Sequence, residues 1–514
     1  MAIKNISEGS SIFEPITQET FARPKIILPS FMPEQIAIID SNEPVIKVRA
    51  GAGTGKTTTL TGYAARRMDA RILYIAFNKA IQEEAAEKFT QNVICRTTHS
   101  IAYSAMNVGQ NYRHKLVPSV RPKTISMELG VEYWKAVLAI STINEFLYSC
   151  DKDIGERHAM AALVKISIHD EIVALARKVW KKMIDPHDGS VGITHDSYLK
   201  LFHLSERRIP GNYDIIMMDE EQDANPVTSA IVAQQPGGKV YVGDRNQSIY
   251  AFRGAENAMD AIDATEYFLS SSFRFGPQIA NVANHLLEYS LGDSARIVGV
   301  GGRSTLNNAH PAGRHALLAR TNGSLFFAAM RALDAGKTVS VIGGPESLRL
   351  TMLMDVYRLS TGDEEKISEI ISPVIKQFKN YDEMRREVSN EEAEDVEMNS
   401  LCKVVDNYGG RLPALIAKIS AKCNAAVSDA DVVLSTAHKS KGLEFDSVEL
   451  ADDFKKPNDD DGIEIQEANL LYVATTRAKK NLVLSASMND FMREPKKNTL
   501  LAQERMRKFN KMGV

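Results

Sequence analysis

A glycine-rich segment over residues 50–57 combines the residue types that a phosphate-binding loop needs. Glycines let backbone N–H groups approach a phosphate chain, a lysine adds positive charge, and a threonine hydroxyl can bind magnesium. The residues are Ala50, Gly51, Ala52, Gly53, Thr54, Gly55, Lys56 and Thr57, followed by Thr58. Ala50 stands where the strict pattern has glycine. The alternative is an ordinary glycine-rich turn, but a strand is expected before the segment and a helix after it, so nucleotide binding is predicted.

Two adjacent carboxylates, Asp219 and Glu220, directly follow an apolar stretch that ends at Met218. A carboxylate at the carboxyl end of a strand, beside a phosphate loop, can hold Mg²⁺ through water, and its neighbour can polarise the attacking water. We therefore expect Asp219 and Thr57 at the metal and Glu220 at the water. An acidic helix N-terminus is the alternative interpretation of the same residues.

A third segment, Val242–Ala255, places the amide of Gln247 and two aromatic rings in a polar sequence. Gln247 is expected to sense the terminal phosphate of a nucleotide. Tyr250 and Phe252 are suited to stacking on bases, which contributes about 1–3 kcal/mol per base whatever the base sequence. The alternative for either ring is a place in the hydrophobic core.

Two arginines far along the chain, Arg274 and Arg477, are candidates for the same site. A phosphoryl-transfer site gains from guanidinium groups that neutralise developing charge. Arginines supplied from a second domain would make hydrolysis depend on domain closure. For each residue taken alone, a surface salt bridge is the alternative.

Strands alternate with helices around these segments. Strands are expected over 46–49, 71–77, 213–218 and 239–242, with helices over 56–60 and 79–89. A second alternating run begins near residue 270, with strands over 315–319, 338–342 and 431–434. This alternation predicts an α/β fold with parallel sheets.

Two long stretches dominated by helical patterns interrupt the alternation, and we interpret each as an insertion. The first includes helical patterns over 131–148 and 158–183. The expected organisation is an N-terminal arm over 1–30, a first α/β domain over 31–103 and 211–268 with its insertion over 104–210, a second α/β domain over 269–344 and 429–490 with its insertion over 345–428, and a basic tail over 491–514.

Composition excludes several classes of protein. The 514 residues include 44% hydrophobic and 25% charged residues, unlike a disordered or fibrous chain. The 62 Lys and Arg nearly balance the 65 Asp and Glu, which neither indicates nor excludes nucleic-acid binding. No apolar run approaches the roughly 20 residues that span a bilayer, and no signal-peptide pattern is recognised. Four widely separated cysteines exclude a local metal cluster and favour a reducing compartment.

Taken in order, the motifs resemble the UvrD/Rep group of superfamily 1 DNA helicases from about residue 31 to 487. The matching segments are PEQ at 33–35, the phosphate loop, THS at 98–100, DEEQD at 219–223, GDRNQSIYAFRGA at 243–255, ARTN at 319–322, TAHKSKGLEF at 436–445 and LLYVATTRAKK at 470–480. Within the group the chain most resembles the F-box DNA helicase branch. The segments that carry this closer resemblance are AFNKAIQEEAAEKF at 76–89, NVICRTTHSIAY at 92–103, SFRFG at 272–276 and HKSKGLEFDSVEL at 438–450. No F-box sequence is recognised ahead of the core.

The resemblance implies a role for each matching residue. Gln35 would read the adenine edge, Phe273 would stack on the base, and Glu444 would meet the ribose. The other positions are the phosphate and metal residues Lys56, Thr57, Gln247, Arg274 and Arg477, and the DNA residues Thr98, His99, Tyr250, Phe252 and His438. For the two histidines, a hydrogen-bonded loop role is the alternative.

The fold that the resemblance implies is two RecA-like P-loop domains with parallel sheets, each carrying a mainly helical insertion. ATP and Mg²⁺ would bind between the domains, and single-stranded DNA would cross their top. The chain would be an ATP-dependent DNA helicase or translocase, moving 3′-to-5′ and acting on single strands and duplex junctions in DNA repair or recombination control.

A different class of function stays open, namely an ATPase subunit that regulates a partner nuclease in a genome-defence complex. The expected protein partner is accordingly a recombinase filament or a nuclease, with no membrane. We expect a cytoplasmic, nucleoid-associated protein in a prokaryote or virus and a nuclear protein in a eukaryote.

Overall fold

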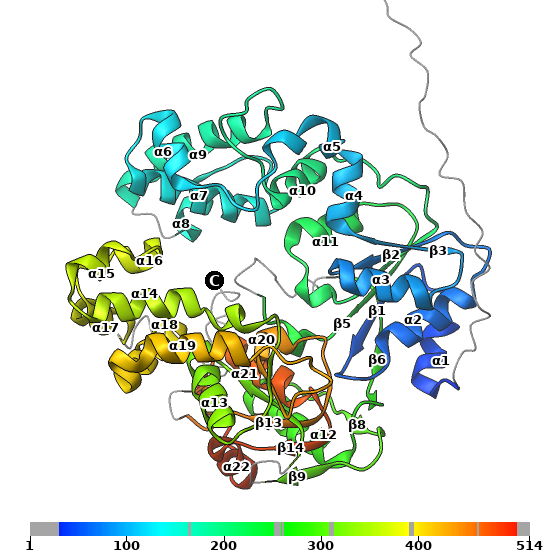
Figure 1. Ribbon diagram of the computed structural model, residues 1–514. Coiled ribbons are helices and arrows are strands. Elements are labelled where there is room, and N and C mark those ends of the chain that lie inside the picture. The colour runs from blue at the N-terminus through cyan, green and yellow to red at the C-terminus, as the bar shows by residue number, and fades with distance from the viewer. Residues whose placement is uncertain are drawn as a thin grey trace, which may run out of the picture.

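Two six-stranded parallel sheets organise the molecule (Figure 1). The computed structural model describes residues 30–162, 166–250, 259, 262–307, 313–389, 395–459 and 462–500. A short pair of parallel strands, β7 (Ser271–Ser272) and β8 (Val298–Gly299), follows the last strand of the first sheet. The α/β fold with parallel sheets expected from the sequence is confirmed.

The first sheet has the strand order β3-β2-β4-β5-β1-β6. Its strands are β1 (Val45–Ala50), β2 (Ile72–Ala76), β3 (Val93–Thr97), β4 (Ile215–Met218), β5 (Gly238–Gly243) and β6 (Thr265–Leu269). Because the central strands are apolar on both sides, helices cover both faces. The helices are α1 (Pro33–Ile39), α2 (Lys56–Ala65) and α3 (Lys79–Lys88) on one face and α4 (Thr98–Ala105) and α11 (Pro226–Ala233) on the other. We call this sheet with its helices the first domain.

The second sheet has the order β11-β12-β10-β13-β14-β9. Its strands are β9 (Thr305–Asn307), β10 (His315–Ala319), β11 (Val339–Val341), β12 (Val432–Thr436), β13 (Phe445–Leu450) and β14 (Ala478–Val483). Its helices include α12 (Pro277–His285), which continues as a π-helix over Leu286–Ser290, and α13 (Asn322–Asp334), α20 (Ala437–Ser440), α21 (Ile465–Thr475) and α22 (Ala486–Arg493). We call this sheet with its helices the second domain.

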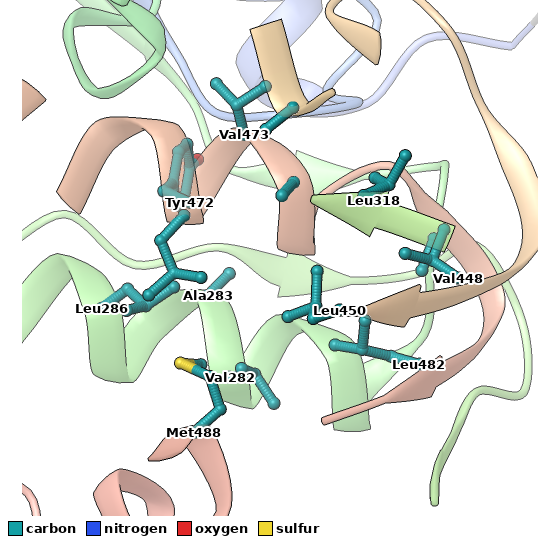
Figure 2. Close-up of a cluster of buried hydrophobic side chains, with 14 of the residues drawn as sticks. Val282, Ala283, Leu286, Leu318, Val448, Leu450, Tyr472, Val473, Leu482 and Met488 are labelled. Carbon is teal, nitrogen blue, oxygen red and sulfur yellow. The ribbon is translucent and has the colours of Figure 1, made fainter. Parts of the chain in front are cut away.

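Figure 2 shows how one face of the second sheet is packed. Leu318 of β10, Leu450 of β13 and Leu482 of β14 point toward helices that come from distant parts of the sequence. Leu286 follows α12, and Tyr472 belongs to α21. This core fixes α21 against the sheet, and α21 carries residues that reach the cleft described below.

Two groups of helices extend to the same side in the view of Figure 1. The first lies between β3 and β4 in the chain and includes α5 (Val108–Asn111), α6 (Pro122–Leu129), α7 (Tyr133–Tyr148), α8 (Glu156–Ala161), α9 (His169–Ile184) and α10 (His195–Leu204). The second lies between β11 and β12 and includes α14 (Leu350–Ser360), α15 (Glu364–Ser368), α16 (Pro373–Lys376), α17 (Tyr381–Val388), α18 (Val396–Tyr408) and α19 (Leu412–Lys422). Helices α6 to α9 share a core of their own, whereas α14 to α19 pack with α13 and the edge of the second sheet.

The structure differs from the sequence-based expectation in some elements. The helical pattern over 158–183 is two helices, α8 and α9, rather than one. Strands β3, β6, β9, β13 and β14 were not expected from the sequence. Within the described ranges, every helix is too short or too polar to cross a bilayer.

Candidate active site between the two domains

The phosphate loop, residues 50–57, connects β1 to α2 through backbone conformations that favour glycine. Gly53 and Gly55 have φ angles of 73° and 76°, a region in which side chains are strained. A Cβ at Gly53 would also lie 2.5 Å from the Cβ of Arg274. Thr54 Oγ1 donates a hydrogen bond to the Gly51 carbonyl at 2.9 Å. The loop leads to the N-terminus of α2, where backbone N–H groups can bind a phosphate.

Carboxylates from the end of β4 meet the first residues of α2. Lys56 Nζ lies 2.9 Å from Glu220 Oε1. Thr57 Oγ1 donates to Asp219 Oδ2 at 3.3 Å. The Tyr74 hydroxyl donates to the same carboxylate oxygen at 2.7 Å, a contact that the sequence did not indicate. The structure therefore brings together the residues predicted for phosphate, metal and attacking water.

The carboxylates in this group differ in their affinity for protons. Burial raises the pKa of Asp219, and the neighbouring Glu220 raises it further. Burial would also raise the pKa of Glu220, but the ammonium groups of Lys56 and Lys441 hold it at about 2. Glu220 has a φ of 53°, a strained conformation for a residue with a side chain. Glu220 is therefore an ionised carboxylate at neutral pH, held in a conformation that is typical of functional sites.

A cavity of about 460 Å³ lies in front of these residues and is lined by both domains. Most of the residues predicted to bind nucleotide line it, namely Gly53, Thr54, Gly55, Lys56, Thr57, Thr58, Asp219, Glu220, Gln247, Phe273, Arg274, Glu444 and Arg477. Its volume lies within the roughly 300–1,000 Å³ of small-molecule sites. Ala50, Gly51 and Ala52 do not line it, and Ala50 and Gly51 line a separate cavity instead.

The residues expected at the base lie close to Gly55. A Cβ at Gly55 would lie 3.1 Å from Gln35 Nε2 and 3.6 Å from the ring of Phe273. The Phe273 side chain is exposed, and its backbone N–H donates to the Gly53 carbonyl at 2.9 Å. Gln35 is buried, donates to Thr59 Oγ1 at 3.0 Å, and does not line the cavity.

Both predicted arginines lie in the cleft. Arg477 is 1% exposed, and its Nη2 donates to Gln247 Oε1 at 3.1 Å. Burial and the neighbouring Arg274 lower the pKa of Arg477 to about 9. Arg274 Nη2 lies 2.7 Å from Glu444 Oε1, so the carboxylate expected at the ribose is paired with an arginine here. A surface salt bridge does not describe Arg477.

Lys441 is a cation of the cleft that the sequence did not single out. Its Nζ donates to Asp223 Oδ2 at 2.5 Å and to the Gln247 carbonyl at 2.6 Å. Burial raises the pKa of Asp223 to about 6, although Lys441 opposes the shift. The sequence could have indicated both residues, because Lys441 lies in the motif TAHKSKGLEF and Asp223 lies in the motif DEEQD.

Tyr472 of α21 is a second residue that the sequence did not single out. Its hydroxyl donates to Asp244 Oδ2 at 3.2 Å, and Gln247 Nε2 donates to the same oxygen at 2.7 Å. The Ala52 N–H donates to the Tyr472 hydroxyl at 3.4 Å. Burial raises the pKa of Asp244. The second domain thus contacts both the phosphate loop and the turn that carries Gln247.

The predicted DNA residues do not all meet in one place. A second cavity of about 450 Å³ adjoins the first and is lined by Thr98, His99 and Tyr250. The ring of Tyr250 stacks on that of Phe77, with centroids 5.6 Å apart, and Lys441 Nζ lies 5.2 Å from its centroid. His99 Nε2 lies 3.1 Å from Asp196 Oδ1 at the start of α10.

Of the two remaining predicted DNA residues, His438 does not line this cavity. His438 lies in the second domain, on α20, where burial and the nearby Arg320 lower its pKa to about 4. Phe252 lies outside the described residues.

Two family models match the chain, one on each domain. The model of an AAA domain matches residues 34–253, and that of the UvrD-like helicase C-terminal domain matches residues 277–489. This chain belongs to the UvrD-like superfamily 1 helicase family. The match covers both domains that line the cavity.

Curated relatives of this UvrD-like chain extend the match across both domains. The chain is 31% identical over 490 residues to F-box DNA helicase 1 of Gallus gallus, an alignment that covers 87% of this chain and 48% of the relative. It is 31% identical over 493 residues to F-box DNA helicase protein 1 of Schizosaccharomyces pombe, covering 86% and 55%. It is 23% identical over 326 residues to DNA helicase IV of Escherichia coli, covering 51% and 47%. The chain therefore spans about half the length of the curated relatives it matches.

Proposed function

We propose that this chain is an ATP-dependent DNA helicase or translocase that moves on single-stranded DNA in the 3′-to-5′ direction. The observation that carries the proposal is the single cavity lined by Lys56 and Glu220 of the first domain and by Arg274 and Arg477 of the second. Arginines of a second domain stabilise a transferring phosphoryl group only when the two domains come together. Hydrolysis is then coupled to closure of the cleft, as a motor requires.

ATP and Mg²⁺ fit the residues around the phosphate loop. The hydroxyl of Thr57 and the carboxylate of Asp219, 3.3 Å apart, are oxygen ligands of the kind that Mg²⁺ uses together with nucleotide phosphates. When bound, the ion supplies charge neutralisation at the β- and γ-phosphates. The exposed ring of Phe273 would stack on the adenine, while Gln35 and Glu444 would hold the base edge and the ribose.

The contacts within the cleft support a specific task for each charged side chain. Lys56, now paired with Glu220, would bind phosphate and release the carboxylate. Glu220 is ionised at neutral pH and would accept a hydrogen bond from the attacking water. Gln247 and Arg477, now bonded to each other, would both bind the γ-phosphate. Loss of that phosphate would restore these pairs.

The second cavity supports a path for single-stranded DNA beside the nucleotide. Tyr250 lines both cavities, and Lys441 lies close to its ring. A base stacked against Tyr250 would therefore lie close to Lys441, whose Nζ donates a hydrogen bond to the Gln247 carbonyl. Thr98, His99 and His438 would contact the strand elsewhere along the path.

The cellular role that we propose is DNA repair or recombination control, at single strands and duplex junctions. The printed names of the relatives, which are DNA helicases, support DNA as the partner. A recombinase filament is the protein partner that such a role would involve. The compartment would be the nucleoid or the nucleus, where that DNA is found.

Steady-state ATP hydrolysis with and without single-stranded DNA tests the proposal. We expect strong stimulation by DNA and its loss in Glu220→Gln, which keeps the size of the side chain and removes the charge. The variant should still bind ATP, because Lys56 and the loop remain. ATP binding by the wild-type chain without stimulation by DNA would contradict an autonomous motor and would favour a subunit that regulates a partner.

A further inference from the structure

A buried carboxylate of the second domain, Asp293, lies beside the turn that carries Gln247. The π-helix Leu286–Ser290 ends just before it, and Gly292, with a φ of 58°, turns the chain back. The Asp293 backbone N–H donates to the Leu287 carbonyl at 2.7 Å. The side chain of Asp293 is 9% exposed.

Three N–H donors satisfy this carboxylate. Arg245 Nε at 2.9 Å and Asn246 Nδ2 at 2.8 Å both donate to Oδ2, and the Ala295 N–H donates to Oδ1 at 2.9 Å. Burial would raise the pKa of Asp293, but these donors lower it, so the group is ionised. Two of the three donors belong to the first domain and directly precede Gln247 in the chain.

Two other contacts between the second domain and this turn face the nucleotide cavity. Arg477 and Lys441 bond to Gln247, and both line the nucleotide cavity. A bound phosphate would compete for these two cations. Asp293 instead lines a separate cavity of about 510 Å³ and does not line that of the nucleotide. Its bonds to Arg245 and Asn246 can therefore persist when nucleotide binds.

We infer that Asp293 is a positioning residue for the γ-phosphate sensor Gln247. It anchors the turn Arg245–Gln247 to the second domain, so that Gln247 and Arg477 approach the γ-phosphate as one unit. The inference rests on the proposed function, since it requires ATP hydrolysis in this cleft. It assigns a role in closure to a residue outside every motif that the sequence analysis used.

The variant Asp293→Asn tests the inference because an amide has one acceptor oxygen where the carboxylate has two. One of the three donors then faces an NH₂ group. We expect kcat for DNA-stimulated ATP hydrolysis to fall about tenfold, as for loss of one hydrogen bond to a charged group. KM for ATP should stay within about twofold, since the phosphate loop is unchanged. Affinity for ADP with aluminium fluoride should fall, while affinity for ADP alone should not.

Two further variants complete the design. Arg245→Gln, at a partly exposed side chain, should reproduce the loss of kcat without a risk to folding. Glu288→Gln is the matched control, because Glu288 lies on the π-helix that precedes Asp293 and pairs with Arg296 of its own domain at 2.6 Å. We expect the control to behave as the wild-type chain does.

The outcomes separate this inference from the proposed function. Unchanged kcat in both Asp293→Asn and Arg245→Gln, in a preparation whose wild-type chain hydrolyses ATP with DNA, would overturn the inference alone. Equal losses of affinity for ADP and for ADP with aluminium fluoride would show a merely structural role and would also overturn it. A wild-type chain without DNA-stimulated hydrolysis would instead overturn the proposed function.

Discussion

Lys56, Glu220, Gln247 and Arg477 pair with one another through contacts that a nucleotide can replace. A buried charge is costly unless it is paired, so each of these groups needs a partner in every state of the cleft. Exchange of a protein partner for a phosphate oxygen keeps each cation paired. At the scale of single residues, Lys56 and Arg477 therefore keep a partner as the site passes between states.

A methyl group at Gly53 of the phosphate loop should weaken nucleotide binding. In Gly53→Ala the new Cβ meets a positive φ and lies 2.5 Å from the Cβ of Arg274, which belongs to a different segment. We expect ATP affinity to fall by more than about tenfold, since strain of about 1–3 kcal/mol adds to the steric conflict. Isothermal titration calorimetry measures the change.

Gly130→Ala is the matched control for this prediction. Gly130 also has a positive φ, 63°, but nothing lies within 4 Å of its Cβ position. This variant should lose some stability and keep its ATP affinity. Equal ATP affinity in the Gly53 and Gly130 variants would contradict the close approach of Arg274 to the loop.

Lowering the pH should destabilise the chain partly through His438. Its pKa falls from 6.5 to about 4 in the folded protein, because burial and Arg320 disfavour the charged ring. The unfolded chain then binds more protons between these values, so stability is present above pH 6.5 and is lost as the pH falls toward 4. When the pH falls from 7 to 5, the free energy of unfolding measured in urea should decrease by on the order of 1–2 kcal/mol more in the wild-type chain than in His438→Asn. Identical losses would contradict the burial of the neutral ring.

At the scale of elements, the site is built where parallel strands end. The carboxyl ends of β1, β4 and β5 supply the phosphate loop, the acidic pair and the turn with Gln247. Strands β4 (IIMM) and β5 (GKVYVG) were predictable from their apolar residues, as expected of strands buried on both faces, whereas β1 (VIKVRA) was predictable because it precedes the glycine-rich loop. Strand β6, with the sequence TEYFL, lies at the edge of the sheet and is largely exposed, so it lacked that pattern.

Some residues of the site could be predicted from the sequence and others could not. Lys56, Asp219 and Glu220 were predictable because each lies next to a strand within a short motif. The contacts of Asp293 and Tyr472 were not, because they join segments 48 and 228 residues apart in the chain. Such contacts depend on how the two domains pack, and local sequence patterns do not predict that packing.

The end of α7 depends on a buried lysine of α10. Lys200 is 0% exposed, and its Nζ donates to the carbonyls of Ser149 and Asp151 at 2.6 Å each. Lys200→Met should lower the free energy of unfolding by about 2–4 kcal/mol, because the carbonyls of Ser149 and Asp151 lose their donor. Chemical denaturation followed by circular dichroism measures the change. The exposed Lys178→Met on α9 is the control, and equal effects of the two variants would contradict this role of Lys200.

At the scale of the whole molecule, two domains contribute to one nucleotide cavity, so its occupancy should change the shape of the chain. We expect a non-hydrolysable ATP analogue with Mg²⁺ to reduce the radius of gyration in small-angle X-ray scattering. The double variant Arg274→Ala and Arg477→Ala should show no reduction, because the second domain loses its phosphate contacts. The exposed Arg296→Ala, outside the nucleotide cavity, should respond as wild type does. Equal compaction in all three chains would contradict closure through the two arginines.

The most direct test of the central claim is displacement of streptavidin from biotinylated single-stranded DNA during ATP hydrolysis. A 3′-to-5′ motor runs toward the 5′ end, so the wild-type chain should displace streptavidin from a 5′ label much faster than from a 3′ label. Glu220→Gln should displace neither, because the carboxylate that polarises water is missing. Displacement from the 3′ label would contradict the proposed direction. ATP hydrolysis without displacement from either end would contradict the claim that this cleft drives movement along DNA.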